Sequence, residues 1–228
     1  MFHRSKPEPS LLLQPLGEER TLSREGRAIL SYSLTLPHLV GEGRGLPPVE
    51  RYYRRLARLW LARWNGPLFQ QACSAEEEAL SRSRPFAPWT ARLSCAVTLQ
   101  TPALLSLWWE VQEQRGGDVR TLRQGDTWSL DRGAPLALRE CLPPALRRRR
   151  ALLPALSRQM EERAGRLGAY PDWPARLRRS FRAEQFWLTA EDAAVFFPPG
   201  TLAPPARGGV CLSLPRDASG RGAERSPA

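Results

Sequence analysis

The side chains that could carry chemistry are a few acidic residues and two histidines, and their spacing builds no catalytic centre. Hydrolysis by paired carboxylates needs two acids held across a cleft with separated pKa values. The acidic groups fall at residues 76–78, on a predicted helix surface, and at Glu191 and Asp192, in a predicted hairpin turn, where solvated charges are expected. His3 lies near the N-terminus and His38 at the end of a predicted strand, so neither is placed to activate a nucleophile. We therefore expect a protein that is not an enzyme.

Metal and cofactor sites are not predicted either. Cys73, Cys95, Cys141 and Cys211 are widely spaced and form no Cys-x-x-Cys pair, whereas a zinc site needs closely spaced or converging ligands. The even number of cysteines permits two disulfides, but small buried hydrophobic residues are the favoured interpretation in a chain of this length. The redox state of the cysteines stays open.

Positive charge is concentrated in one segment. The chain has a formal net charge of +11, and Lys6 is its only lysine, so 33 of its 34 basic residues are arginine. Residues 142–182 hold eleven arginines against three acidic residues, which accounts for +8 of the total. The run Arg147, Arg148, Arg149 and Arg150 is typical of a solvated helix face and lacks the interleaved aromatic residues of single-strand binders. Nucleic-acid binding through residues 142–182 is therefore kept only as an alternative.

Hydrophobic periodicity predicts the elements that position these residues. Alternation of apolar and polar side chains, which is typical of strands with one buried face, predicts strands at 28–36, 89–99, 105–111, 126–130, 136–138, 186–189, 195–197 and 210–214. Helical spacing predicts helices at 49–64, 70–80 and 143–167, the first ended by Asn65 and Gly66 and the last kinked or restarted at Pro154. The prediction is an α+β fold with a mainly antiparallel twisted sheet packed with helices.

One domain is expected between two irregular ends. Residues 1–24 are predicted to form a flexible arm, residues 25–215 an α+β domain, and residues 216–228 a disordered tail without large apolar residues. No stretch reaches the length of a membrane-spanning helix, and the apolar run at 11–13 is too short for a signal peptide. As written, the chain is expected to stay in the cytoplasm.

A surface for a partner is predicted on one face of the strand at 105–111. Trp108 alternates with Trp109 and shares its face with Ser106, Glu110 and Gln112, so it either lies beneath a covering element or contributes to a binding surface. Gly116 and Gly117 predict a hairpin turn, because they lack the strand-loop-helix context of a phosphate loop. The predicted partner-binding residues are Trp108, Glu110, Gln112, Gly116, Gly117 and Asp118.

The order of these motifs is similar to a known family. Aromatic residues line the first predicted helix, the hairpin ends in Gly-Gly, and a threonine-aromatic pair precedes an Asp-x-Gly turn. The C-terminal part follows with a hairpin, a proline corner, a glycine and a closing strand. The matching residues are Tyr52, Tyr53, Trp60, Trp64, Gly116, Gly117, Thr127, Trp128, Asp131, Gly133, Leu136, Leu138, 186–189, 195–199, 202–204, Gly208 and 210–215.

Over residues 28–215 the chain resembles the RsiV-like domain of unknown function, which forms the extracellular lysozyme-binding part of the anti-sigma factor RsiV and also occurs beside peptidoglycan deacetylase domains. The resemblance implies the fold and a non-catalytic binding module for a protein or cell-envelope ligand, often outside the cell. It also leaves a cell-wall polysaccharide hydrolase or deacetylase-associated protein as an alternative. Asp118 and Val119 replace the Ala-His of the family, so lysozyme enters only as a family partner.

Overall fold

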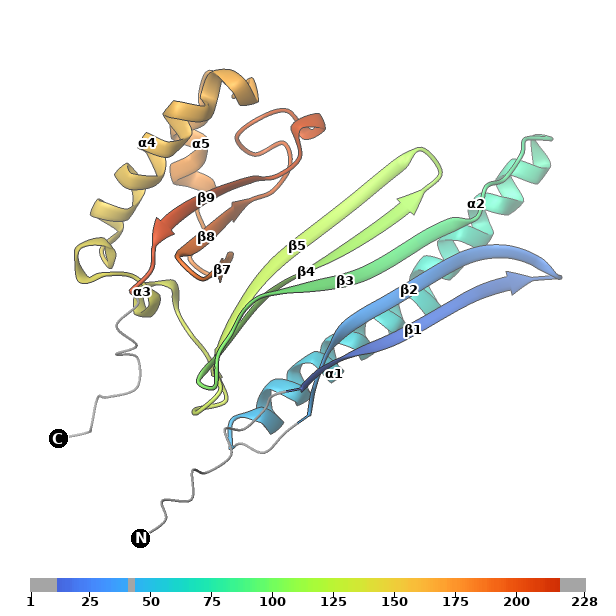
Figure 1. The fold of residues 1–228 in the computed structure, drawn as a ribbon. Coiled ribbons are helices and arrows are strands. Elements are labelled where there is room, and N and C mark those ends of the chain that lie inside the picture. Colours follow the sequence, from blue (N-terminus) through green and yellow to red (C-terminus); the bar gives the residue numbers. More distant parts are fainter. Residues whose placement is uncertain (1–11, 41–43, 218–228) are drawn as a thin grey trace, which may run out of the picture. The chain divides into compact units, whose positions relative to one another are not determined.

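The computed structural model describes residues 12–40 and 44–217, which form an α+β fold with a six-stranded and a three-stranded sheet (Figure 1). Contacts within the chain divide it into two compact units. Among the described residues, the first unit holds 12–40, 44–96, 109–123 and 130–134, and the second holds 97–108, 124–129 and 135–217. The boundaries fall inside three long strands rather than in linkers, and a single domain over residues 25–215 stays a prediction.

The large sheet has the order β1-β2-β3-β4-β5-β6. Its strands are β1 (Leu12–Arg24), β2 (Arg27–Val40), β3 (Trp89–Gln100), β4 (Leu104–Arg115), β5 (Asp118–Ser129) and β6 (Ala134–Pro135). β1 and β2 are antiparallel, whereas β2 and β3 are parallel, because the helices between them return the chain to the same end of the sheet. The predicted α+β class is thus confirmed, and the sheet contains one parallel pair.

Strand β1 corrects the prediction of an N-terminal arm. It pairs with β2 along its whole length, from Leu12 opposite Val40 to Arg24 opposite Arg27. Its sequence lacks clean alternation, so main-chain hydrogen bonds to the edge of β2 fix it as a strand. Residues 1–11 of the predicted arm and 218–228 of the predicted tail lie outside the described residues.

A continuous helical path crosses the first unit. It consists of α1 (Leu46–Arg63), the π-helical turn η1 (Trp64–Leu68) and α2 (Phe69–Ser81), which lie beside β2 in Figure 1. The predicted stop at Asn65 and Gly66 is wrong. Pro67 lies inside η1, and the wider turn accommodates a residue that has no N–H to donate to the helix.

The core of the first unit lies between α1, η1 and the sheet. Trp64 is fully buried, and its ring lies 5.4 Å from that of Tyr32 and 6.1 Å from that of Trp60. The other large side chains that are almost fully buried in this unit are Ile29, Leu30, Leu34, Leu36, Tyr53, Leu68 and Leu93. The predicted aromatic helix face is therefore a packing surface.

The second unit contains the whole arginine-rich segment at 142–182. Its elements are α3 (Leu138–Cys141), η2 (Pro144–Leu146), α4 (Arg149–Leu167), α5 (Trp173–Ser180), β7 (Phe186–Leu188), β8 (Asp192–Phe197), η3 (Pro205–Arg207) and β9 (Val210–Pro215). The predicted helix at 143–167 begins only at Arg149, and Pro154 lies inside it. The predicted strand at 136–138 is wrong, because β6 ends at Pro135 and α3 begins at Leu138.

The antiparallel sheet β7-β8-β9 buries both of its faces. One face packs with α4 and α5 around Leu156, Met160 and Leu177, while Trp187, Ala194 and Phe196 form a smaller cluster of their own. Within the described residues, no helix is both long and apolar enough to cross a membrane.

Candidate functional site

The tip of the β4–β5 hairpin is a tight turn at the predicted Gly-Gly. Gly116 has φ +62°, in the left-handed region that favours glycine, and Gly117 has open space around it. Asp118 follows and forms an exposed ion pair with Arg120, with Arg120 Nε 3.2 Å from Asp118 Oδ2. The turn therefore brings three of the predicted partner-binding residues together at an exposed tip.

The outer half of β5 is exposed over residues 118–122. Val119 and Leu122 are 50% and 46% exposed, and alternation along the strand places them on opposite faces. Beyond β5 the sheet continues only with β6, which has two residues and lies near Thr127, whose carbonyl accepts the N–H of Leu136. Over residues 118–122, the outer edge of β5 has no neighbouring strand within the described part of the chain.

The other predicted residues of this surface are divided between the two units. Glu110 is half-buried and accepts from Arg123 Nε at 2.8 Å, and Gln112 is exposed. Trp108 belongs to the second unit, where it is half-buried and packs against the cluster of Trp187 and Phe196. The structure thus gives Trp108 a packing contact, and its role in partner binding stays a prediction.

Ser106, predicted on the same face as Trp108, is fully buried. Its hydroxyl lies 2.8 Å from the hydroxyl of Thr127 and accepts the backbone N–H of Leu188 at 2.7 Å. These two contacts connect β4, β5 and β7 within the second unit. The face of β4 that carries Trp108 is therefore buried at Ser106 and becomes accessible to solvent only from Glu110 onward.

Two members of the arginine run at 147–150 are structural. Arg147 donates from Nε to the carbonyl of Leu142 at 2.9 Å and from Nη2 to Asp217 Oδ2 at 3.3 Å. Arg149 donates from Nη2 to the carbonyl of Arg178 at 3.0 Å, which ties the start of α4 to the end of α5. These two side chains therefore satisfy backbone carbonyls in addition to carrying charge.

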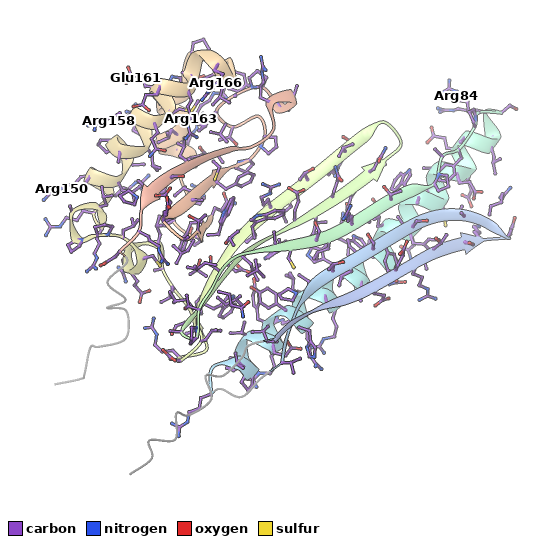
Figure 2. All side chains as sticks on the ribbon, in the orientation of Figure 1. Arg84, Arg150, Arg158, Glu161, Arg163 and Arg166 are labelled. Atoms are coloured by element: carbon purple, nitrogen blue, oxygen red, sulfur yellow. The ribbon has the colours of Figure 1, made fainter. Side chains whose placement is uncertain are left out.

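Several other arginines of this region are exposed and have no acidic partner among the described residues. Arg148 and Arg150 are exposed, and neither side chain has an acidic partner among the described residues. Figure 2 shows Arg150, Arg158 and Arg166 spaced along the length of α4. Arg178 of α5 is also exposed and has no acidic partner in this part of the described chain.

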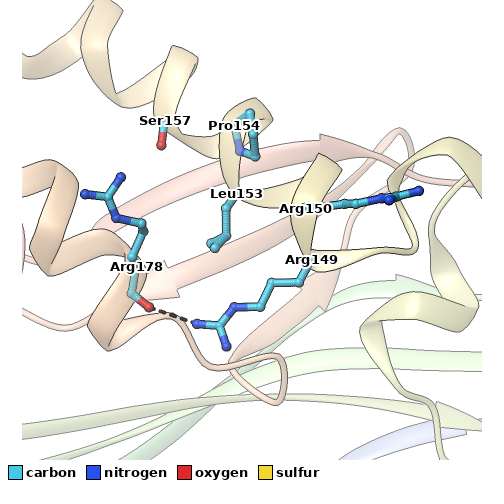
Figure 3. Close-up of a pocket in the computed structure, with 6 residues that line it drawn as sticks. All are labelled: Arg149, Arg150, Leu153, Pro154, Ser157 and Arg178. Carbon is cyan, nitrogen blue, oxygen red and sulfur yellow. Dashed lines mark hydrogen bonds between the residues drawn. The ribbon is translucent and has the colours of Figure 1, made fainter.

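A groove of about 440 Å³ lies between the first half of α4 and the end of α5. It is lined by Arg149, Arg150, Leu153, Pro154, Ser157 and Arg178, as Figure 3 shows. We call it the α4–α5 groove. Leu153 and Pro154 supply an apolar surface, and three arginines border it. A second hollow of about 480 Å³ shares Arg149 but also contains Glu184.

His38 and several of the acidic residues are engaged by neighbouring side chains. His38 Nδ1 lies 2.6 Å from Glu50 Oε1, which also accepts from Arg54 Nε at 2.6 Å. Burial raises the pKa of Glu50, but hydrogen bonds from Arg54, the backbone of Leu39 and His38 outweigh it and leave this pKa below its ordinary value. The Glu50 carboxylate is thus negatively charged and already accepts hydrogen bonds from three donors.

Glu76 contradicts the prediction of an exposed acidic helix surface. It is 3% exposed, and its Oε1 lies 2.8 Å from Arg27 Nε on β2. Glu77 and Glu78 are exposed as predicted, and Glu191 is exposed in the turn before β8. Among the described residues, no three His, Cys, Asp or Glu side chains come together as a metal site.

A buried ionic network around Glu113 escaped sequence reasoning. Glu113 Oε1 accepts from Arg63 Nε at 2.7 Å and from the indole N–H of Trp64 at 3.3 Å, and Oε2 accepts from Arg63 Nη2 at 2.9 Å. Arg115 also donates to Oε2, and its guanidinium lies 5.7 Å from the Trp89 ring. The only signal was a glutamate at an alternation position that otherwise holds Trp109 and Val111.

The four cysteines form no disulfide. Cys141 is buried and its thiol contacts the carbonyl of Ala137 at 3.7 Å. Burial raises the pKa of Cys141 to about 12 and that of Cys95 to about 11. Both thiols are therefore protonated and uncharged at neutral pH. They behave as small hydrophobic side chains.

The fold has solved structural neighbours. Comparisons with protein-family models and with curated proteins gave no match. A crystal structure of a DUF3298 family member from Bacteroides fragilis matches with a TM-score of 0.65 and 15% sequence identity, over 92% of each chain. A DUF3298 family protein from Pseudomonas aeruginosa matches with a TM-score of 0.58 and 17% identity, over 91% of this chain and 92% of that one.

The chain shares the fold of these DUF3298 proteins. At such identities the likeness concerns the fold alone, so the surfaces described above must be interpreted from their own residues. In this fold the hairpin tip gathers Gly116, Gly117 and Asp118, and β4 adds Gln112 on the exposed part of its face. The free edge of β5 was not predicted, because residues 118–125 are polar and were not assigned to a strand.

Proposed function

We propose that the protein is a non-catalytic binding module, and that the edge of β5 over residues 118–122 pairs with an extended segment of a protein partner. The observation that carries the proposal is that residues 118–122 of β5 are exposed and that their outer edge has no neighbouring strand in the described part of the chain. An edge strand presents a row of N–H and C=O groups that can form a ladder with an added strand. Main-chain pairing gives affinity at such an edge, and neighbouring side chains select the partner.

Side chains around this edge suit an added strand. Val119 and Leu122 offer one apolar contact on each face of the sheet, and both are about half exposed. Asp118 and Arg120 neutralise each other at the tip, so the edge carries no strong local charge that would repel a partner. Gln112 lies exposed on the neighbouring strand and adds a polar contact.

The non-catalytic part of the proposal rests on how the ionisable groups are engaged. His38 and Glu50 are paired with each other, Glu76 is paired with Arg27, and Glu113 is enclosed by arginines. A general base must present a lone pair to a substrate in a cleft. Each of these carboxylates instead accepts from at least one neighbouring arginine and supports the packing of the fold.

The choice of partner class is supported by two likenesses. The fold is that of DUF3298 proteins, and the sequence resembles the RsiV-like domain, whose known ligand is lysozyme. A protein or cell-envelope ligand follows from this resemblance, and lysozyme is the first probe to test. Lysozyme binding measured by calorimetry, and capture from bacterial envelope extract, would show whether a partner depends on the β5 edge.

The first test changes the side chains at the edge. The double variant Val119→Lys/Leu122→Lys should weaken partner binding by about tenfold or more, because an apolar contact is lost on each face of the added strand. The control Leu59→Lys/Leu80→Lys makes the same chemical change at two exposed leucines of α1 and α2 and should bind normally. If both variants bind like the unmodified protein, or if no partner is found, the proposal is wrong.

A second test addresses main-chain pairing. Successive residues of a strand direct their N–H groups to opposite edges, so Arg120→Pro and Thr121→Pro remove N–H groups that point in opposite directions. One variant disturbs the pairing of β5 with β4 and lowers the melting temperature, while the other removes only an outward donor. The variant that keeps its melting temperature should lose partner binding, and normal binding by that variant would contradict strand addition.

A further inference from the structure

The second unit carries a basic surface that is separate from the proposed binding edge of β5. Arg150 and Arg178 border the α4–α5 groove, and neither guanidinium has an acidic partner among the described residues. Arg149 also lines the groove and donates one N–H to the Arg178 carbonyl, and its positive charge remains. Asp172, which precedes α5, is already paired with Arg176 of the same helix.

The helix geometry adds to this positive potential. The groove begins at the N-terminus of α4, a helix of 19 residues whose first turn contains no acidic side chain and no side-chain cap. The N-terminal end of a helix carries a partial positive charge from its unpaired N–H groups. Clustered arginines at this end are normally unfavourable, so an external anion would relieve their repulsion.

We infer that the α4–α5 groove binds a flexible linear polyanion that carries repeated phosphate groups. Figure 3 shows the side chains of Arg150 and Arg178 extending in different directions from the groove. They are therefore not arranged to clamp one phosphate between them. Each can instead meet a different phosphate of one chain that passes over Leu153 and Pro154.

Two other anionic partners fit the surface less well. A membrane would require protruding apolar side chains among the arginines, but the exposed large hydrophobic residues among the described part of the chain lie outside α4 and α5. A single-stranded nucleic acid would use exposed aromatic rings for base stacking, and no aromatic residue lines the groove. The ring of Tyr170, at the end of α4, is already covered by Arg176 at 4.2 Å.

Inorganic polyphosphate is the probe for this site. The unmodified protein should bind it with an affinity that falls as salt rises, because arginine contacts release counterions. Arg150→Glu/Arg178→Glu should weaken binding by about tenfold or more and reduce the slope of log Kd against log salt by about 1.5. Arg149 is left unchanged, because its hydrogen bond holds α4 to α5. The neutral variant Arg150→Gln/Arg178→Gln should also weaken polyphosphate binding, but without the added repulsion between introduced carboxylates and the phosphates.

A matched control separates a site from overall charge. Arg84→Glu/Arg207→Glu changes the net charge by the same amount at two exposed arginines outside the groove, the first of which is labelled in Figure 2. It should retain most of the binding. Equal losses in both double variants, or no binding by the unmodified protein, would overturn the inference. Tighter binding to duplex DNA or anionic vesicles than to polyphosphate, with the same arginine dependence, would also overturn it.

Discussion

The substitution Glu113→Gln provides the sharpest test of the packing in the first unit. The change keeps the shape of the side chain and removes its charge, so it isolates the ionic network from cavity effects. Glu113 is 5% exposed and Arg115 is 12% exposed, which leaves little access for water to replace a lost partner. The amide nitrogen of glutamine would also face the N–H groups of Arg63 or Arg115.

The expected loss in the free energy of unfolding is about 3 kcal/mol. Breaking a buried ion pair on one side typically costs about 3–5 kcal/mol, because the remaining charge stays buried without compensation. Arg63 is 38% exposed, so water can hydrate it after the change, and the lower end of that range applies. Outside this network Arg115 donates from Nη1 to Gln71 Oε1 at 3.3 Å, and its Nε is already buried without a hydrogen-bond partner.

The matched control is Glu110→Gln on the same strand. Glu110 and Arg123 form an ion pair at 2.8 Å, but their side chains are 24% and 29% exposed, so the expected loss is about 1 kcal/mol or less. Urea denaturation followed by circular dichroism gives both free energies of unfolding. Equal losses in the two variants, or a loss below about 1 kcal/mol for Glu113→Gln, would refute the importance of the buried network.

The same network fixes the sign of an acid effect. Burial raises the pKa of Glu113, but the hydrogen bonds and charges of Arg63 and Arg115 outweigh it and hold this pKa below the ordinary value of 4.5. Its contribution to stability is therefore present above pH 4.5 and is lost as the pH falls through the lower pKa of the folded state. The stability difference between the unmodified protein and Glu113→Gln should shrink in acid, and a difference that grows there would contradict this assignment.

Two further predictions concern a glycine pair and a cysteine. Gly45→Ala places a Cβ 1.8 Å from the carbonyl oxygen of Leu130 and should destabilise the protein by about 2 kcal/mol. Gly165→Ala has open space around its Cβ inside α4 and should stabilise the protein by about 0.5–1 kcal/mol. A higher melting temperature for Gly45→Ala than for Gly165→Ala would contradict the backbone contact at Gly45. Cys141, with a pKa of about 12, should carry about a thousandfold less thiolate at pH 8 than an exposed cysteine and react correspondingly slowly with a disulfide reagent, so rapid labelling of the folded protein would contradict its burial.

Local periodicity predicted the elements whose side chains decide their own environment. The helix expected at 49–64 is α1 at Leu46–Arg63, and the strand expected at 89–99 is β3 at Trp89–Gln100. Strand β1 and the first half of β5 were missed, since their polar side chains give no clear alternation, and each becomes a strand through main-chain pairing with the adjacent strand of its hairpin. The turn η1 was missed for a related reason: Asn65, Gly66 and Pro67 are local stop signals, yet the buried contacts of Trp64 and Leu68 carry the helix through them.

The site residues show the same limit. Gly116 and Gly117 were located correctly because a hairpin turn depends on local backbone conformation. The burial of Ser106 and the packing of Trp108 depend on β7 and β8, which lie about eighty residues further along the chain. Composition did reveal the basic segment, but only the fold separates Arg147, which is bound to Leu142 and Asp217, from Arg150, which has no acidic partner among the described residues.

The two proposed surfaces use different physics, and salt therefore separates them. Pairing along residues 118–122 of β5 relies on main-chain hydrogen bonds and two apolar side chains, and neither is strongly screened by ions. Binding in the α4–α5 groove relies on arginine charges and should weaken steeply as salt rises. The surfaces also belong to different units, so Val119→Lys/Leu122→Lys should leave polyphosphate binding intact and Arg150→Glu/Arg178→Glu should leave protein-partner binding intact. Loss of both activities in either variant would mean that the ligands compete for one surface, and the assignment of separate sites would then fail.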